Sequence, residues 1–142
     1  MTKVSNISRA MKILRKIGDI CEKVEHWNHF ARRRQDLFGV FDIISVCPLG
    51  AIKFIQVFGT ERGEYSAHWQ KMIDTQPELI HRLLGNSKLS IELWGWHGVK
   101  KTVSKKAFFL VHIIQGIDKV QRVRIFTDGT YEELPDGGGA QD

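Results

Sequence analysis

The chain has 142 residues, of which 42% are hydrophobic, with a formal net charge of +5 and a pI of about 9.4. This length suits one domain with a buried core, and the positive charge favours an anionic partner. The two cysteines cannot form a disulfide framework, and the sequence lacks both an apolar run of about 18 residues and a signal-peptide h-region, so we expect a cytoplasmic protein without membrane association.

The first 35 residues are strongly basic, with nine Lys or Arg against three acids. Apolar residues at helical spacing predict a helix from Ile7 to Ile17, capped by Ser5 or Asn6 and stopped by Gly18. Residues 20–27 are expected to form a first strand and residues 29–35 a loop. The loop contains three consecutive arginines, Arg32, Arg33 and Arg34, which are interpreted either as a solvated surface or as phosphate contacts.

A β-hairpin is predicted next. Phe41–Cys47 and Ala51–Phe58 are mostly apolar and β-branched, and residues 48–50 between them read Pro-Leu-Gly, a three-residue turn. If the residues that flank this turn pair with each other, Asp42 lies opposite Gln56 on one face of the sheet. A carboxylate inside such an apolar strand is costly unless a partner or a metal ion holds it.

The remainder alternates helices and strands. Ser66 is expected to cap a helix that ends near Ile73, and residues 75–78 (Thr-Gln-Pro-Glu) are interpreted as a capping box that restarts a helix through Leu84. The predicted strands that follow are Lys88–Trp96, Phe108–Ile114, Gln121–Phe126 and Thr130–Leu134, the last two joined by an Asp128-Gly129 turn. Residues 97–106 form a basic loop. We expect one domain over residues 1–135 and a flexible tail over residues 136–142.

The order of the first elements is helix, strand, strand, strand, helix, strand, with an acid on the second strand and a polar residue opposite it on the third. This order resembles the PD-(D/E)xK nuclease superfamily, and in particular its small Holliday-junction resolvases and phage nucleases. The resemblance covers roughly residues 7–96. Phe41-Asp42-Ile43-Ile44 matches the strand that carries the family's Asp, and Ile55-Gln56-Val57-Phe58 lies where the family has (D/E)xK. It implies an α/β fold with a restriction-endonuclease-like αβββαβ core, a central mixed sheet flanked by helices, and extra C-terminal strands.

Two motif residues differ from the family pattern, because Gln56 replaces the acid and Phe58 replaces the lysine. Mg²⁺ prefers hard, usually anionic oxygen ligands, so Asp42 needs a second acid. Glu25 and Asp36 are the two candidates. Lys71 is the candidate for a relocated lysine that assists the attacking water.

The resemblance implies a metal-dependent endonuclease that hydrolyses DNA with Mg²⁺ or Mn²⁺, in which Asp42 and Gln56 hold the metal. Arg32, Arg33, Arg34, Lys100 and Lys101 would contact phosphates, and a homodimer is expected if the substrate is a four-way junction. The alternatives are a DNA-binding protein of the same fold that no longer cleaves, and a structural or protein-interaction domain. In the plainest interpretation Asp42 pairs with a nearby arginine and Gln56 is a satisfied core amide.

Overall fold

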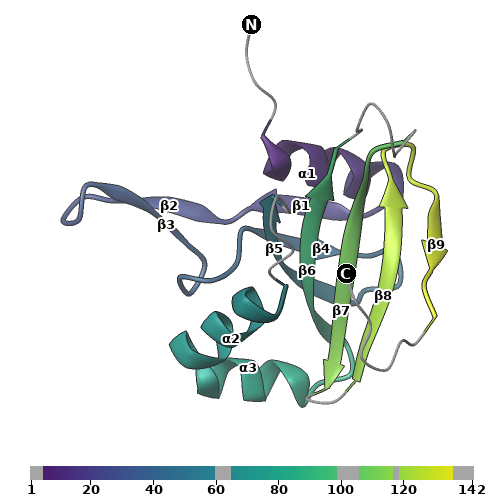
Figure 1. Cartoon of the computed structure of the whole chain (residues 1–142). Coiled ribbons are helices and arrows are strands. Elements are labelled where there is room, and N and C mark those ends of the chain that lie inside the picture. The colour runs from purple at the N-terminus through teal and green to yellow at the C-terminus, as the bar shows by residue number, and fades with distance from the viewer. Residues whose placement is uncertain (1–4, 60–64, 99–105, 117–118, 136–142) are drawn as a thin grey trace, which may run out of the picture.

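The computed structural model describes residues 5–59, 65–98, 106–116 and 119–135, except the side chains of residues 25–28 and 34. In this part of the chain there are three helices and nine strands (Figure 1). The helices are α1 (Asn6–Lys16), α2 (Tyr65–Thr75) and α3 (Pro77–Leu84). The strands are β1 (Ile20–Lys23), β2 (Glu25–Asn28), β3 (Arg33–Asp36), β4 (Ile43–Val46), β5 (Ile52–Gly59), β6 (Leu89–His97), β7 (Phe108–Gly116), β8 (Lys119–Phe126) and β9 (Tyr131–Glu133). None of these helices is long and apolar enough to cross a membrane.

Seven strands form one mixed sheet in the order β1-β4-β5-β6-β7-β8-β9. Every neighbouring pair is antiparallel except β5 and β6, which are parallel because α2 and α3 form the connection between them. The predicted α/β class, with a mixed sheet flanked by helices, is therefore confirmed. The first three strands of this sheet, β1, β4 and β5, form an antiparallel series before the helical crossover to β6.

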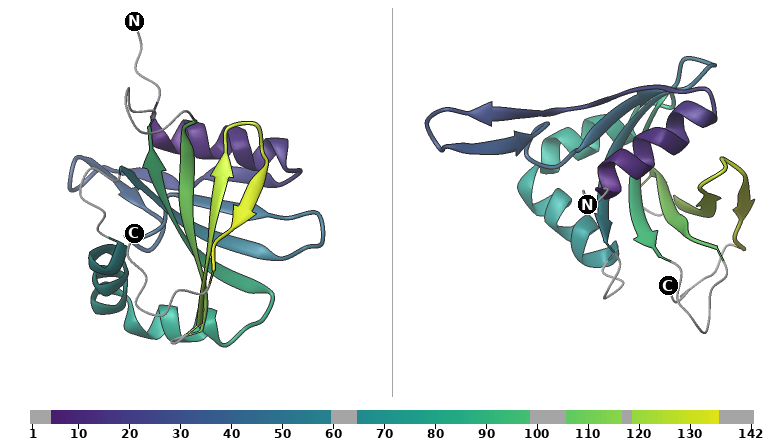
Figure 2. Two further views of the ribbon diagram at one scale, coloured as in Figure 1. Left: turned by 45° about the vertical axis from the view of Figure 1, so that its right-hand side comes forward. Right: turned by 90° about the horizontal axis from the view of Figure 1, so that it is seen from above.

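Helix α1 covers one face of the sheet, and α2 and α3 cover the other (Figures 1 and 2). On one face, Ala10, Ile13 and Leu14 of α1 pack in a core cluster with residues of β1, β4, β5 and β6, including the fully buried Trp94. On the other face, Met72 of α2 and the apolar side of α3 pack against Ile91 and Leu93 and other residues. Because side chains alternate along a strand, Ile91 and Leu93 of β6 face α2 and α3, whereas Glu92 and Trp94 lie on the face toward α1.

Single residues in the sequence explain where several helices begin or end and where one turn forms. Ser5 caps α1, since its hydroxyl accepts a hydrogen bond from the Ser8 N–H, and Gly18 follows the helix with φ +96°. Pro77 is the first residue of α3, where its missing N–H costs nothing. Gly129 has φ +92° in the turn between β8 and β9, which confirms the predicted Asp128-Gly129 turn.

Strands β2 and β3 form a separate two-stranded sheet, here called the arm, that projects away from the seven-stranded sheet (Figures 1 and 2). The prediction of one strand over residues 20–27 was wrong, because the chain leaves the main sheet after Lys23 and pairs with β3 instead. The prediction of a loop over residues 29–35 was also wrong, since Arg33–Asp36 is a strand. Only residues 29–32 form the tip of the arm.

Two predicted helix caps were wrong as well. Ser66 lies inside α2, which begins at Tyr65, and Thr75 is the last residue of that helix. The residue before Pro77 is Gln76, whose side chain makes no capping bond and donates instead to the Phe38 carbonyl oxygen. The basic loop from residue 99 to 105 and the tail from residue 136 lie outside the described residues.

Candidate functional site

Asp42 lies where the arm meets the main sheet. Its side chain is buried, with 8% of the residue exposed, and its Oδ2 accepts a 2.8 Å hydrogen bond from the backbone N–H of Val57 on β5. The Asp42 carbonyl oxygen accepts a bond from the Val24 N–H, immediately before β2 begins. The side-chain carboxylate and the backbone carbonyl of Asp42 therefore both hold the junction between the arm and the sheet. The hydrogen bond from Val57 also offsets part of the free energy cost of burying the carboxylate.

The predicted hairpin register is confirmed within the strands. Ser45 pairs with Lys53 and Ile43 with Ile55, and the Cys47 N–H donates to the Ala51 carbonyl oxygen across the turn. The ladder ends one pair before Asp42 and Gln56, so the predicted cross-strand pairing of these two residues was wrong. Beyond the ladder, the Asp42 N–H donates to the carbonyl oxygen of Ile55, which is already the partner of Ile43. Asp42 and Ile43 therefore both oppose Ile55, as in a β-bulge.

Gln56 on β5 is half-buried, and only one end of its amide is satisfied. Its Nε2 donates a 3.1 Å hydrogen bond to the Val40 carbonyl oxygen, a residue two positions before Asp42. Its Oε1 is buried and has no hydrogen-bond partner among the described residues. Buried acceptors are normally satisfied by protein, water or an ion, so this oxygen is a place where a donor or a cation would be stabilised.

The two candidate second acids lie at the base of the arm. Glu25, the first residue of β2, pairs in register with Asp36, the last residue of β3. Asp36 is half-buried, and the side chain of Glu25 is not among those that the structure describes. Because Glu25 follows Val24, which is bonded to Asp42, the topology brings all three acidic positions to one end of the arm.

The family's lysine position is occupied by an aromatic ring that is part of the core. Phe58 stacks on His68 with ring centroids 4.0 Å apart and meets Tyr65 edge-on at 4.9 Å. Lys71, the candidate replacement, is exposed on α2. Within the side chains that the structure describes, no group of three or more His, Cys, Asp or Glu is arranged to hold a metal ion.

The predicted phosphate-binding arginines lie at the far end of the arm. Arg32 and Arg33 are exposed, and Arg32 has φ +53° in the turn at the tip. Arg34 lies on β3, with its side chain outside the description. Lys100 and Lys101 lie outside the described residues. The arm thus carries positive charge away from the body of the protein.

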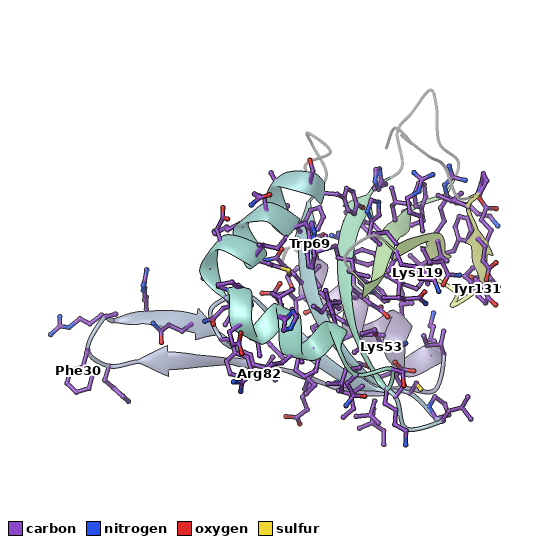
Figure 3. All side chains as sticks on the ribbon, turned by 90° about the horizontal axis from the view of Figure 1, so that it is seen from below. Phe30, Lys53, Trp69, Arg82, Lys119 and Tyr131 are labelled. Carbon is purple, nitrogen blue, oxygen red and sulfur yellow. The ribbon has the colours of Figure 1, made fainter. Side chains whose placement is uncertain are left out.

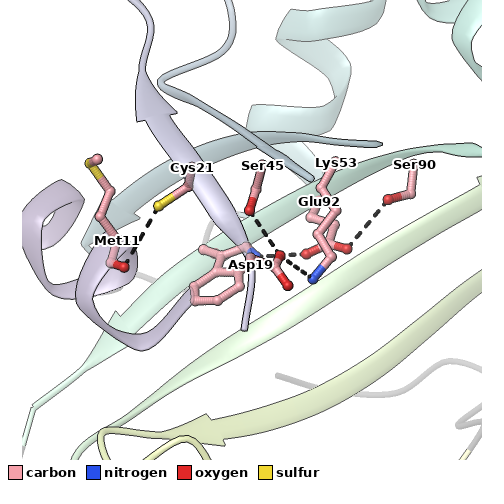
Figure 4. Close-up of polar contacts among 8 residues, drawn as sticks. Met11, Asp19, Cys21, Ser45, Lys53, Ser90 and Glu92 are labelled. Carbon is pink, nitrogen blue, oxygen red and sulfur yellow. Dashed lines mark hydrogen bonds and ion pairs between the residues drawn. The ribbon is translucent and has the colours of Figure 1, made fainter. Parts of the chain in front are cut away.

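A second polar cluster, not predicted from the sequence, lies on the face of the sheet that α1 covers (Figure 4). Asp19 follows α1 and is 6% exposed, and its Oδ2 accepts a 2.8 Å hydrogen bond from Ser45 and lies 2.9 Å from the Lys53 ammonium. Glu92 on β6 is 4% exposed and accepts a bond of 2.9 Å from the Trp94 indole N–H. The Ser90 hydroxyl donates to the other oxygen of Glu92 at 3.4 Å.

The charges of this cluster depend on each other. Burial raises the pKa of the Glu92 carboxyl, and the nearby Lys53 ammonium opposes that rise only in part. Burial alone would lower the pKa of Lys53, but the carboxylates of Glu92 and Asp19 outweigh it, so the pKa of Lys53 is raised. The lysine therefore stays charged between the two acids. Because the carboxylates are almost fully covered, we assign the cluster to the stability of the sheet, not to contact with a substrate.

Comparison of the chain with protein-family models, with curated proteins and with solved structures gave no match in any of the three.

Proposed function

We propose that this protein binds DNA through its arm and hydrolyses phosphodiester bonds in a reaction that depends on Mg²⁺ or Mn²⁺ and on Asp42. The observation that carries the proposal is the junction between arm and sheet. A buried carboxylate, a buried amide oxygen without a hydrogen-bond partner among the described residues, and two further acidic positions meet there, at the foot of a projecting segment that bears arginines. Oxygen donors of this kind are what Mg²⁺ prefers.

The order of elements supports the same proposal. A helix, three antiparallel strands, a helical crossover and a parallel fourth strand follow each other in α1, β1, β4, β5, α2–α3 and β6. This order is similar to that expected for a restriction-endonuclease-like core, and the arm would then be an insertion between the first two strands of the core. Gln56 lies on the third of these strands, where the family has its acid, whereas Asp42 lies directly before the second strand and not on it.

Asp42 and Gln56 fit a metal ion by the chemistry of their donors. The carboxylate oxygen of Asp42 that does not receive the Val57 bond and the Oε1 of Gln56 would hold the ion, with Glu25 or Asp36 as the second acid. A bound divalent ion would neutralise charge on the phosphate and acidify a water molecule. The protein itself would fix the Asp42 carboxylate through the Val57 N–H, hold the Gln56 amide through Val40, and bind the DNA backbone through Arg32, Arg33 and Arg34.

A second candidate function is DNA binding without cleavage. It is favoured by one observation, the Phe58 ring that packs against Tyr65 and His68 at the position of the family's lysine. In this case Asp42 would hold the arm to the sheet through Val24 and Val57 and have no catalytic role.

A cleavage assay separates the two functions. Labelled duplex, single-stranded, flap and four-way DNA are incubated with the protein in Mg²⁺, in Mn²⁺ and in EDTA, and binding is measured on the same substrates. Cleavage of any form that requires the metal supports the nuclease. Binding of DNA without cleavage of any form in either metal supports the second function and contradicts the first. If four-way DNA is cut, light scattering should show a dimer, because two cuts need two sites.

A further inference from the structure

The tip of the arm carries an aromatic side chain in full solvent exposure. Phe30 is 102% exposed, the largest exposure among the large hydrophobic residues that the structure describes, and it lies at the far end of the arm (Figure 3). It takes no part in either core cluster. A single exposed hydrophobic residue is ordinary on a protein surface, so exposure alone assigns no role to it.

The charge around Phe30 indicates what kind of partner would cover it. Residues 29–35 read His-Phe-Ala-Arg-Arg-Arg-Gln and include no acid. His29, Arg32 and Arg33 are exposed with Phe30 at the same tip. An aromatic ring beside arginines on a projecting segment suits nucleic acid, in which phosphates and the flat faces of bases alternate along one strand.

Continuous duplex DNA offers no face for this ring, because each base is stacked on both sides. A base face becomes available in a single strand, at a flap, at a branch point, or where an inserted side chain unstacks a step. We infer that Phe30 stacks on an unpaired base while Arg32 and Arg33 hold the flanking phosphates, so that the arm selects branched or single-stranded DNA over continuous duplex. This inference rests on the proposed function and specifies the substrate class of that function.

The length of the arm sets where this contact falls. Strands of four residues at about 3.3 Å per residue, with the turn added, place Phe30 roughly 15 Å from the junction at Asp42. At 3.4 Å per base pair this corresponds to about four base pairs. The unpaired base that Phe30 recognises would therefore lie about four positions from the phosphate at Asp42.

The test compares Phe30→Ala, Phe30→Trp and Phe30→Leu with the wild-type chain. Binding to a single strand, a flap, a four-way junction and a duplex of equal length is measured by fluorescence anisotropy at a fixed salt concentration. Loss of one stacked base should weaken binding of the first three forms about tenfold in Phe30→Ala, with the duplex affinity changed less than about twofold. Phe30→Trp should restore binding, and Phe30→Leu should not, because only an aromatic ring stacks.

Leu49→Ala is the matched control. Leu49 is 97% exposed in the turn after β4, at the opposite end of that strand from Asp42, so this change also removes one exposed apolar side chain. Its DNA affinities should equal those of the wild type. The dependence of affinity on salt should be unchanged in Phe30→Ala, since the residue carries no charge. A 2-aminopurine placed four positions from the cut should be quenched by the wild type and not by Phe30→Ala.

The outcomes separate this inference from the proposed function. If the wild type binds or cleaves DNA but Phe30→Ala binds every form as the wild type does, the inference is overturned and the proposed function stands. If the wild type binds no DNA form, both the inference and the proposed function are contradicted. If anionic phospholipid vesicles bind the wild type but not Phe30→Ala, while DNA binding is equal in both, the tip contacts membranes and the inference is overturned. Equal weakening for duplex and for branched DNA also overturns it.

Discussion

The half-buried Lys53 and the buried Asp19 form an ion pair in which the ammonium nitrogen lies 2.9 Å from the carboxylate oxygen Oδ2 (Figure 4). The pair joins the segment after α1 to the first half of β5, and Ser45 of β4 donates to the same oxygen. Removing one partner of a buried pair leaves the other charge without compensation, which usually costs more than the pair contributes.

We therefore expect Lys53→Met to destabilise the protein by about 3 kcal/mol, because Asp19 and Glu92 would remain buried without a positive charge between them. Denaturation in urea gives the free energy of unfolding of both proteins. Lys88→Met, which removes an exposed lysine, is the control and should change stability by less than about 0.5 kcal/mol. A loss for Lys53→Met as small as that of the control would contradict a stabilising role for the cluster.

The pH dependence of stability follows from the pKa of Glu92, which burial raises from its ordinary value of 4.5. Between the ordinary and the raised value the native state binds more protons than the unfolded state, so the free energy of unfolding falls as the pH increases. Glu92→Gln keeps the shape of the side chain and removes this titration. The stability of the wild type relative to Glu92→Gln should therefore decrease as the pH rises above 4.5.

Urea denaturation of both proteins between pH 4 and 8 measures this difference. A difference that stays constant with pH, or that increases with it, would show that Glu92 does not titrate with a raised pKa in the native state. The pKa of Lys53 is also raised, and the stability that this contributes is lost only at alkaline pH, as the pH rises through the pKa of Lys53 in the native state. The titration of Lys53 therefore does not affect the comparison at acidic pH.

The main features of the central hairpin could be predicted because its signals are local. The turn at residues 48–50 and the alternation of β4 and β5 fix which residues pair, and the observed pairs of Ser45 with Lys53 and Ile43 with Ile55 agree. The irregular pairing at Asp42 could not be predicted, because it depends on the arm that begins beside it at Val24.

The arm and the buried cluster were missed for different reasons. β3 reads Arg-Arg-Gln-Asp, which has neither β-branched residues nor alternation, and it is a strand only because β2 pairs with it. The cluster joins a residue after α1 to residues of β4, β5 and β6. Lys53 meets Ser90 only in the register of the parallel pair, which is set by the packing of α2 and α3 and not by a local turn.

Asp42 should have two separable roles. Asp42→Asn keeps an oxygen that can accept the Val57 bond but removes the negative charge, so we expect metal-dependent cleavage to be abolished and DNA affinity to stay within about twofold of the wild type. Asp42→Ala also leaves the Val57 N–H unsatisfied and should lower the free energy of unfolding by about 2 kcal/mol.

Cleavage rates, anisotropy and urea denaturation of the two variants measure these effects. Cleavage by Asp42→Asn at the wild-type rate would place the catalytic site elsewhere. Equal stability of Asp42→Ala and Asp42→Asn would show that the Val57 bond contributes little.

Gln56 is the position where the family's acid can be restored. Gln56 bonds Val40, two residues before Asp42, and its neighbour Val57 bonds the Asp42 carboxylate, so in Gln56→Glu like-charge repulsion should lower the melting temperature without metal by several degrees. A bound divalent ion removes this repulsion. The rise in melting temperature on adding Mn²⁺ should therefore be larger in Gln56→Glu than in the wild type, and cleavage should be equal or faster. The same melting shift in both proteins would indicate that residue 56 does not face a metal site.

The charge of the arm should determine how DNA binding responds to salt. Each phosphate contact of an arginine releases counterions, and it contributes about 0.9 to the slope of log affinity against log salt concentration. Replacing Arg32, Arg33 and Arg34 with Ala should therefore reduce this slope by up to about 3 and weaken binding of every DNA form. A control with Lys12, Arg15 and Arg82 replaced by Ala removes the same number of charges from exposed positions on α1 and α3. The wild-type slope should persist in the control, because these residues lie outside the arm. If the two triple variants shift the slope equally, only the net charge of the protein matters and the arm is not the DNA-binding surface.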